Sequence, residues 1–261
     1  MENLDLSGRK ALVVGIANEH SLAWSAARHF RAAGADLAVT WLNEKARPYV
    51  EPLATQLEAP VAMACDVRAP GSLEAVFEAI RARWGRLDIV FHAIAWMRKE
   101  DLQGRLTDCS ADGFGEAMTI SCHSLIRMAH LAEPLMDQGG SVMTLSFLGA
   151  ERVVDHYNVM GPVKAALEAS VRYLAHELGP RRIRVNAISA GPVMTRAASG
   201  LDHFDALLEA SAAAAPLHRR IEADEVGRTA LALASGAMAA VTGEVVHVDA
   251  GLHVEGLVLR S

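Results

Sequence analysis

A tyrosine and a lysine seven residues apart, Tyr157 and Lys164, are the pair of side chains best suited to chemistry. Seven residues are nearly two turns of an α-helix, so this spacing puts both side chains on one helix face. Pro162 fits best in a first helical turn, which predicts that Tyr157 lies just before the helix proper. A nearby ammonium favours negative charge on the phenol and strengthens it as a donor to an oxyanion. The spacing also fits a buried tyrosine beside a structural lysine, and this alternative stays open.

A second candidate site lies near the start of the chain, where an apolar run ends at Gly15 and a helix is expected from Ser21. Such a strand–turn–helix presents backbone N–H groups and a helix N-terminus, which together bind a pyrophosphate. The usual G-x-G-x-x-G is absent, because no glycine follows Gly15 until Gly34, so a turn residue and a helix cap remain an equal alternative. Asp66 follows a later apolar run and fits either an adenine amino group or a capped turn.

The secondary-structure elements that must position these residues alternate between strands and helices along the whole chain. Short apolar runs predict strands over residues 11–14, 36–41, 61–65, 87–92, 141–145, 183–188 and 244–248. The segments between them predict helices over 22–33, 43–57, 70–84, 111–136, 163–178, 204–214 and 223–234. Continuous apolar strands separated by helices are typical of a parallel sheet covered on both faces. We therefore predict an α/β, doubly wound (Rossmann) sheet of seven parallel strands with a ligand crevice at their carboxyl ends.

The composition limits the possible classes of protein and argues against several kinds of binding site. The chain has 261 residues, of which 51% are hydrophobic and 21% charged, so we expect one globular domain over residues 1–261. A net charge of −6 argues against nucleic-acid binding. Three cysteines without CxxC spacing and a start without a signal peptide favour the cytoplasm. The apolar stretch at 230–241 is too short to span a bilayer, and the eleven histidines form no HExxH, so neither a membrane nor a metal is expected.

The sequence around these residues resembles the enoyl-acyl-carrier-protein reductases, the divergent Y-x6-K branch of the short-chain dehydrogenase/reductases. The resemblance runs through nearly the whole chain, in segments 13–18, 21–24, 51–53, 65–67, 92–95, 149–152, 157–161, 184–192, 197–200 and 243–246. It implies NADH-dependent reduction of the carbon–carbon double bond of a trans-2-enoyl thioester, the last step of a fatty-acid elongation cycle. It also implies a homotetramer in which the helices near 111–136 and 163–178 pack between subunits.

The resemblance further implies a role for each site residue. Residues that would bind the cofactor are Gly15, Ser21 and Leu22 at the pyrophosphate and its ribose, Asp66 and Val67 at the adenine, Ile94 beside the adenosine, Lys164 at the nicotinamide ribose, and Val193, Thr195 and Ala197 over the nicotinamide. Residues that would contact the substrate are Met97, Phe147, Tyr157, Met160 and Phe204. Tyr157 would donate to the thioester oxygen and stabilise the enolate that forms there. Residues 193–215 would form a substrate-binding loop and helix.

Three positions near the site depart from the family pattern. Phe147 stands where many relatives have a second tyrosine, so its ring shapes the pocket but cannot relay a proton. Leu42 stands where relatives often have glutamine, and no arginine at 42 or 43 meets a 2′-phosphate, so NADH is favoured over NADPH. Pro162 takes the place of a helix former and is expected to shift the geometry of Tyr157 and Lys164.

The substrate segment departs from the family in its charge. Residues 197–217 include Asp202, Asp205 and Glu209 but no Lys or Arg, whereas acyl-carrier proteins are strongly acidic. Like charges weaken docking and slow encounter, so a coenzyme A thioester or another carrier becomes a candidate substrate form. Candidates for a displaced basic patch are Arg98, Lys99, His218, Arg219 and Arg220. A related short-chain reductase with another substrate, and a nucleotide-binding protein without catalysis, stay open as alternatives.

Overall fold

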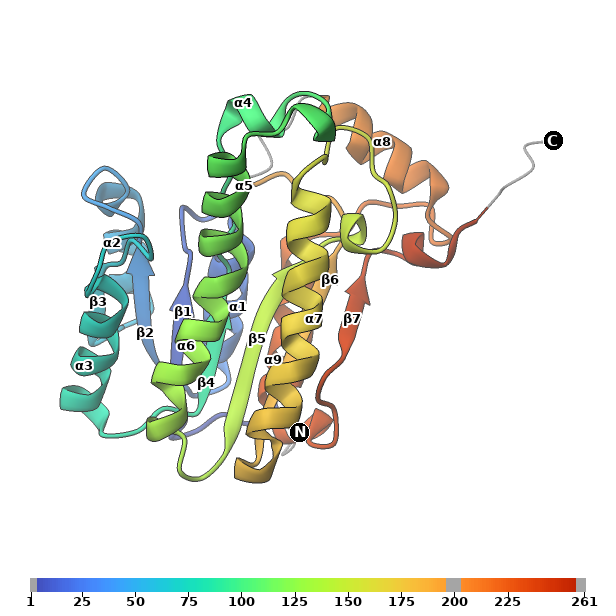
Figure 1. The fold of residues 1–261 in the computed structure, drawn as a ribbon. Helices are drawn as coiled ribbons and strands as arrows, with labels where there is room; N and C mark the ends of the chain where they lie inside the picture. The colour runs from blue at the N-terminus through green and yellow to red at the C-terminus, as the bar shows by residue number, and fades with distance from the viewer. Residues whose placement is uncertain (1–3, 196–202, 257–261) are drawn as a thin grey trace.

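Seven parallel strands form the centre of the computed structural model, which describes residues 4–195 and 203–256 (Figure 1). The strands are β1 (Lys10–Val14), β2 (Asp36–Trp41), β3 (Val61–Ala64), β4 (Ile89–His92), β5 (Gly140–Ser146), β6 (Ile183–Ala190) and β7 (Val245–Val248). Their order across the sheet is β3-β2-β1-β4-β5-β6-β7, and every neighbouring pair is parallel. The chain reverses its direction of travel between β1 and β4, which opens a crevice at their carboxyl ends. The predicted doubly wound sheet is confirmed.

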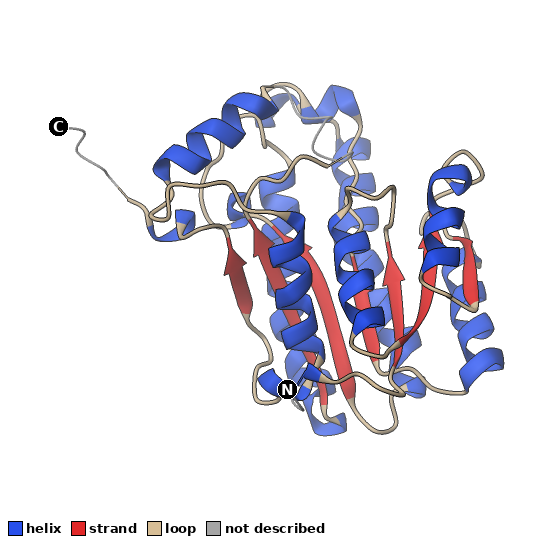
Figure 2. Cartoon of the chain, turned by 180° about the vertical axis from the view of Figure 1, so that it is seen from behind, coloured by secondary structure: helices blue, strands red, loops and turns tan. Residues whose placement is uncertain are grey.

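Helices cover both faces of this sheet. They are α1 (Leu22–Ala32), α2 (Arg47–Gln56), α3 (Ser72–Trp84), α4 (Lys99–Leu102), α5 (Ala111–Met118), α6 (Ser124–Ala132), α7 (Met160–Leu178), α8 (Phe204–Ala214) and α9 (Ala223–Ala234). In Figure 1, α3, α6 and α7 lie in front of the sheet, whereas α1, α2 and α9 cover the face seen in Figure 2. The helices α4 and α8 lie beyond the carboxyl ends of the strands (Figure 1), and residues of both line a cavity there.

Two apolar cores, one on each face, hold the layers together. Along β1, Leu12 and Val14 enter the core beneath α3, α6 and α7, while Ala11 and Val13 enter the core beneath α1, α2 and α9. Successive side chains of a strand point to opposite faces, so a strand buried on both faces is predominantly apolar along its length. This is why the continuous apolar runs in the sequence locate the strands so well.

The long helix expected over 111–136 is present as one helical run over residues 111–135, but it is not α-helical throughout. Between α5 and α6, residues Thr119–His123 form one wide π-helical turn, and a 3₁₀ turn containing Pro134 follows α6. The wide turn brings Ser121 to the loop after β4, where its hydroxyl accepts from the main-chain N–H of Trp96 at 3.0 Å. Such single wide turns often occur at functional sites. Within the described ranges, no helix is long and apolar enough to cross a membrane.

Candidate functional site

Two adjoining cavities open at the carboxyl ends of the strands. The first, here called the Gly15 cavity, has a volume of about 370 Å³ and is lined by Gly15, Leu42, Asp66, Val67 and Ile94 among others. The second, the Lys164 cavity, has a volume of about 220 Å³ and is lined by most of the remaining predicted residues, namely Leu22, Met97, Phe147, Tyr157, Met160, Lys164, Val193, Thr195 and Phe204. Ala95 and Trp96 line both cavities. Ala197 lies outside the described residues.

Gly15 allows the turn after β1 to pass close to the end of β4. Its φ is +105°, and a Cβ at this position would lie 2.1 Å from the carbonyl oxygen of Ala93. Only glycine adopts this backbone conformation readily and also leaves room for the neighbouring strand. Both strands therefore end at one narrow crevice, which forms the floor of the Gly15 cavity.

Ser21 occupies the N-cap position of α1, but its side chain does not cap the helix. Its hydroxyl instead donates to the carbonyl oxygen of Asn18 at 2.6 Å. Within the described residues, no side chain caps the first turn of α1, and this turn contains no acidic residue. The N–H groups of a first helical turn have no partner within the helix, so these donors are suited to an anionic group of a ligand. The interpretation of Ser21 as a capping side chain is wrong.

Asp66 is engaged in a turn. Its carboxylate accepts from the guanidinium of Arg68 at 2.8 Å and from the main-chain N–H of the same residue at 3.0 Å. Hydrogen bonding to Arg68 holds the pKa of Asp66 below its usual range. Of the two alternatives for this residue, the capped turn is therefore present, although Asp66 also lines the Gly15 cavity. The cavity is lined by two cations as well, Lys45 and Arg68, which the sequence reasoning missed.

Lys164 is buried in the second turn of α7, with 5% of its surface exposed. Its ammonium donates to the carbonyl oxygen of Leu145, near the end of β5, at 2.7 Å. Burial lowers the pKa of this lysine to about 8, while the negative charge of Glu168 acts in the opposite direction. An ammonium has three N–H donors, and Leu145 supplies the single hydrogen-bond acceptor found among the described residues. The other donors are therefore suited to hydroxyl groups of a ligand in the Lys164 cavity.

Tyr157 lies three residues before α7, as the position of Pro162 predicts. Pro162 is the third residue of this helix, where a missing N–H costs no hydrogen bond, and Tyr157 and Lys164 still line one cavity. Burial and the charge of Glu168 raise the pKa of Tyr157, so the phenol keeps its proton. The cost of burying the anion sets the direction of this pKa shift, and the strengthening of the phenol as a donor by Lys164 stays a prediction.

A buried carboxylate beneath the cavity is a feature that the sequence reasoning missed. Glu168 lies one helical turn after Lys164 and accepts a hydrogen bond of 2.5 Å from the hydroxyl of Ser146, which itself lines the Lys164 cavity. Burial raises the pKa of Glu168. The i,i+4 spacing of Lys164 and Glu168 was the available signal, but the same spacing also occurs between ion pairs on solvent-exposed helix faces.

The arginines proposed as a displaced basic patch are paired with carboxylates. Arg98 contacts Glu116 at 2.7 Å, and Arg219 contacts Glu225 at 2.7 Å. Arg220 pairs with Glu209, which is one of the acidic residues of the substrate segment. These guanidinium charges are largely compensated locally, so the structure does not support a patch with excess positive charge around them.

Comparison with known proteins agrees with this arrangement. The family model of enoyl-(acyl carrier protein) reductase matches residues 15–253. The chain is 48% identical over 252 residues to the NADH-dependent enoyl-[acyl-carrier-protein] reductase 1 of Rhizobium meliloti, covering 97% of this chain and 93% of that protein.

Two solved structures of reductases are similar over nearly their full length. The enoyl-(acyl-carrier-protein) reductase of Anaplasma phagocytophilum, solved with NAD, superimposes with a TM-score of 0.93 at 47% identity, covering 98% of each chain. The Bacillus cereus enoyl-acyl carrier protein reductase, solved with NADP+ and indole naphthyridinone, has a TM-score of 0.94 at 45% identity, covering 98% of this chain and all of that one. Taken with the two adjoining cavities, these matches show that the chain belongs to the enoyl-(acyl carrier protein) reductase family.

Proposed function

We propose that this protein is an NADH-dependent reductase of the trans-2 double bond of enoyl thioesters in fatty-acid synthesis. The observation that carries the proposal is the Lys164 cavity, in which a protonated phenol and a buried ammonium share a wall with apolar side chains. This combination suits a substrate with an apolar chain and one polar reacting group. The matched family and the names of its members support the same activity.

The residues present fit a nicotinamide dinucleotide. The uncapped first turn of α1 and the crevice at Gly15 suit its pyrophosphate, while Asp66, Val67 and Ile94 line the cavity for its adenosine. The unused donors of Lys164 suit the hydroxyls of the second ribose. Val193, Thr195 and Ala197 are assigned to the nicotinamide, and the first two line the Lys164 cavity. When bound in its reduced form, the dinucleotide supplies a hydride to the β carbon of the substrate.

Tyr157 is assigned as the catalytic donor to the thioester oxygen. Negative charge develops on this oxygen as the double bond is reduced and an enolate forms. A phenol whose pKa is raised stays protonated, so it enters the reaction as a hydrogen-bond donor. Met97, Phe147, Met160 and Phe204 line the same cavity with apolar surface that suits the acyl chain and excludes water.

A spectrophotometric assay tests this proposal. Adding a crotonyl or longer enoyl thioester to the protein and NADH should lower the absorbance of NADH, and NADPH should support a slower reaction. NADH binding without turnover of any enoyl thioester would contradict the proposal and favour a non-catalytic nucleotide-binding protein.

The charges of the substrate segment favour a coenzyme A thioester as a second form of the substrate. Asp205 is exposed on α8, and the arginines nearest in sequence are paired with carboxylates. An acidic carrier protein therefore meets little unpaired positive charge there. The test is to compare one enoyl chain on acyl-carrier protein and on coenzyme A. A strong preference for the carrier protein that declines steeply with salt would contradict this second form.

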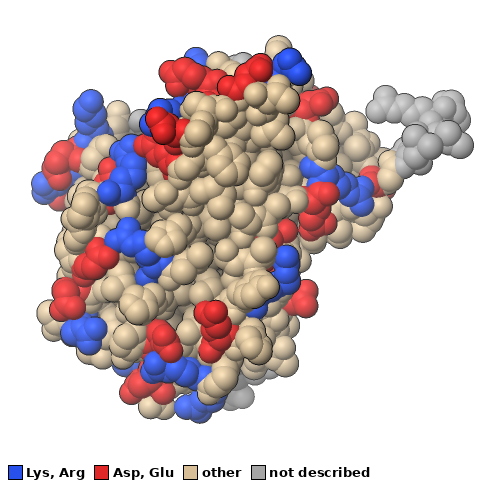
Figure 3. Space-filling model, viewed as in Figure 1, with Lys and Arg blue, Asp and Glu red and all other residues tan. Residues whose placement is uncertain are grey.

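We also propose a homotetramer in the cytoplasm. On the face shown in Figure 3, which includes α6 and α7, a wide central area lacks charged side chains. Exposed apolar residues on this side are Phe114, Ile126 and Tyr173, the last with 72% of its surface exposed. Such areas favour association between identical chains. The three free cysteines fit a reducing compartment. Light scattering coupled to gel filtration tests the assembly, and a monomer would contradict it.

A further inference from the structure

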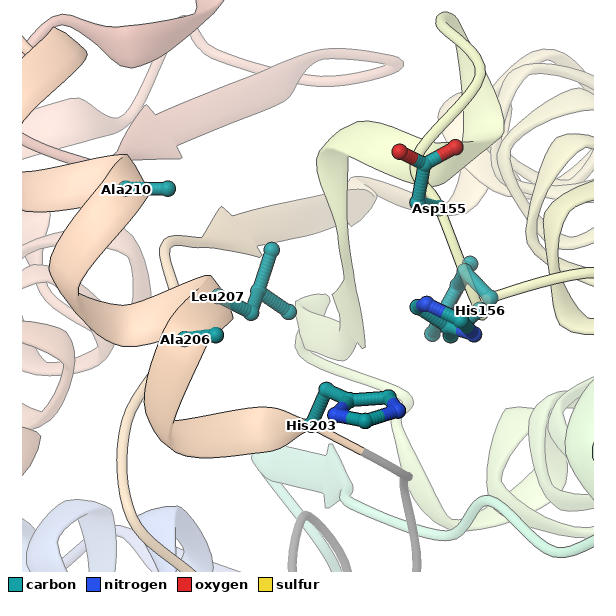
Figure 4. A pocket seen from close by; sticks show the side chains of 7 residues that line it. Asp155, His156, His203, Ala206, Leu207 and Ala210 are labelled. Atoms are coloured by element: carbon teal, nitrogen blue, oxygen red, sulfur yellow. The ribbon is translucent and has the colours of Figure 1, made fainter.

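Two histidines beside Tyr157 have their rings in contact and line a third cavity. The rings of His156 and His203 have centroids 5.0 Å apart, and the cavity between their loops has a volume of about 410 Å³. Figure 4 shows His156 on the loop before α7 and His203 at the start of α8, with the side chain of Leu207 extending from α8 beside them. Asp155, Ala206 and Ala210 complete the lining together with Tyr157. We call this the histidine cavity.

The histidine cavity adjoins the Lys164 cavity through two shared residues, Tyr157 and Leu207. The phenol therefore stands in a wall common to both. An enoyl thioester matches two cavities that share one phenol. Its carbonyl group lies between an apolar acyl chain and the arm that carries the sulfur. Apolar side chains, including Met97 and Met160, line the Lys164 cavity, so the acyl chain belongs there. The arm then leaves on the other side of Tyr157.

The histidine cavity has the chemistry that such an arm requires. Both imidazoles and the carboxylate of Asp155 are exposed at its rim, while its α8 side consists of alanine and leucine side chains. An imidazole has one nitrogen that donates and one that accepts, which complements an amide group. The nearby carboxylate of Asp155 disfavours a phosphate, because like charges repel.

We propose that the histidine cavity binds the pantetheine arm of the thioester, and that His156 and His203 hydrogen-bond its amide groups. The inference rests on the proposed function, because Tyr157 must hold the thioester carbonyl for the arm to pass this way. Pantetheine is common to coenzyme A and to acyl-carrier proteins, so the cavity serves both substrate forms. The two histidines are positioning residues for the substrate.

The test compares one enoyl group on three carriers: an S-ethyl thioester without amides, a pantetheine thioester, and the coenzyme A thioester. The measured quantity is the preference, defined as kcat/KM for the pantetheine thioester divided by kcat/KM for the S-ethyl thioester. Because the preference is a ratio, a general loss of activity cancels. A neutral hydrogen bond is worth enough to change the preference by about two- to tenfold for each histidine.

Glycine is the appropriate replacement for both histidines. The φ angles of His156 and His203 are +64° and +57°, a region that glycine adopts without strain. His156→Gly and His203→Gly should each lower the preference, chiefly through KM, and the coenzyme A thioester should lose the same factor. His156→Asn should retain part of the preference, because asparagine tolerates this backbone and its amide also donates and accepts.

His218→Gly is the matched control. His218 is exposed, has a φ of +47° and lies outside the lining of the three cavities, so its variant should keep the wild-type preference. An unchanged preference in both His156→Gly and His203→Gly would overturn the inference. A loss confined to the coenzyme A thioester would also overturn it, because contacts would then be made to phosphate or nucleotide. If the wild-type protein reduces the S-ethyl thioester, these negative results leave the proposed function intact; if it reduces none of the three, both fail.

Discussion

The ring of Phe147 meets the ring of Tyr157 edge to face, with centroids 4.8 Å apart and planes inclined at 61°. This geometry places the positive edge of one ring against the negative face of the other, which is favourable for aromatic pairs. Phe147 therefore supports the position of the phenol, although it has no proton to exchange. Substitutions at Tyr157 and at Phe147 distinguish a role in the reaction from a role in packing.

Tyr157→Phe should lower kcat by about 10²–10³-fold, because one donor to the developing oxyanion is lost, while the Kd for NADH changes little. Phe147→Leu should lower kcat by less than about tenfold, because only a packing contact of about 1 kcal/mol is lost. Steady-state kinetics and a fluorescence titration with NADH measure the two quantities. Comparable losses of kcat in the two variants would contradict the assignment of Tyr157.

NADH affinity should depend on pH through Lys164. Its pKa is about 8 in the protein without ligand, so the ammonium is present below that pH and is lost above it. The Kd for NADH should therefore be lowest below about pH 8 and should rise at higher pH, by about tenfold in total, because charge-assisted hydrogen bonds are lost. Titrations across this range measure the change.

Lys164→Met should bind NADH weakly at every pH, whereas the exposed Lys99→Met should behave like the wild-type protein. A Kd that does not vary with pH in the wild-type protein would show that the ammonium of Lys164 does not hold the cofactor.

Acid should destabilise the fold through His92. This fully buried ring lies 2.7 Å from the hydroxyl of Ser124 and 2.8 Å from that of Thr144. Ser124 donates its hydroxyl proton to the carbonyl oxygen of Ile120, so it accepts from Nε2–H of His92. Burial, aided by the charge of Lys164, lowers the pKa of His92 from 6.5 to about 3.

Between these two values the unfolded state binds a proton that the folded state does not. The free energy of unfolding should therefore decrease as the pH is lowered from about 6.5 towards 3, with His92 contributing about 1.4 kcal/mol per pH unit. Urea denaturation at a series of pH values measures the slope. His92→Gln should show a shallower slope, and the exposed His20→Gln should keep the full one. Equal slopes in the wild-type protein and His92→Gln would rule out this contribution.

Gly15→Ala should disrupt the fold at the crevice. The added Cβ would lie 2.1 Å from a main-chain oxygen, and the φ of +105° is strained for alanine, so a loss of about 3 kcal/mol or more is expected. Gly115→Ala in α5 is the control, because its Cβ meets no atom within 4 Å and alanine favours a helix by about 0.5–1 kcal/mol. Urea denaturation of both variants tests this, and a Gly15→Ala protein as stable as the wild type would contradict the close packing of β1 against β4.

The alternation of apolar runs and helical segments in the sequence was sufficient to predict the architecture of the sheet. The apolar runs predicted each strand to within a few residues, because a strand buried on both faces consists mainly of apolar side chains that are adjacent in sequence. The long helix over 111–136 was predicted as well, but its π-helical turn at Thr119–His123 was not, because such a turn keeps the apolar character of a helix. At this turn Ser121 contacts Trp96, a residue that is distant in sequence.

The sequence by itself determined the strands, the crevice at their carboxyl ends and the place of Tyr157 just before the helix that carries Lys164, because each follows from the pattern of residues along the chain. Only the tertiary structure decided that the phenol stays protonated, that Asp66 pairs with Arg68 while lining a cavity, and that His156 meets His203. Desolvation, charge pairing and cavity shape depend on which distant segments the folded chain brings together. Local sequence patterns do not determine the distances between those segments.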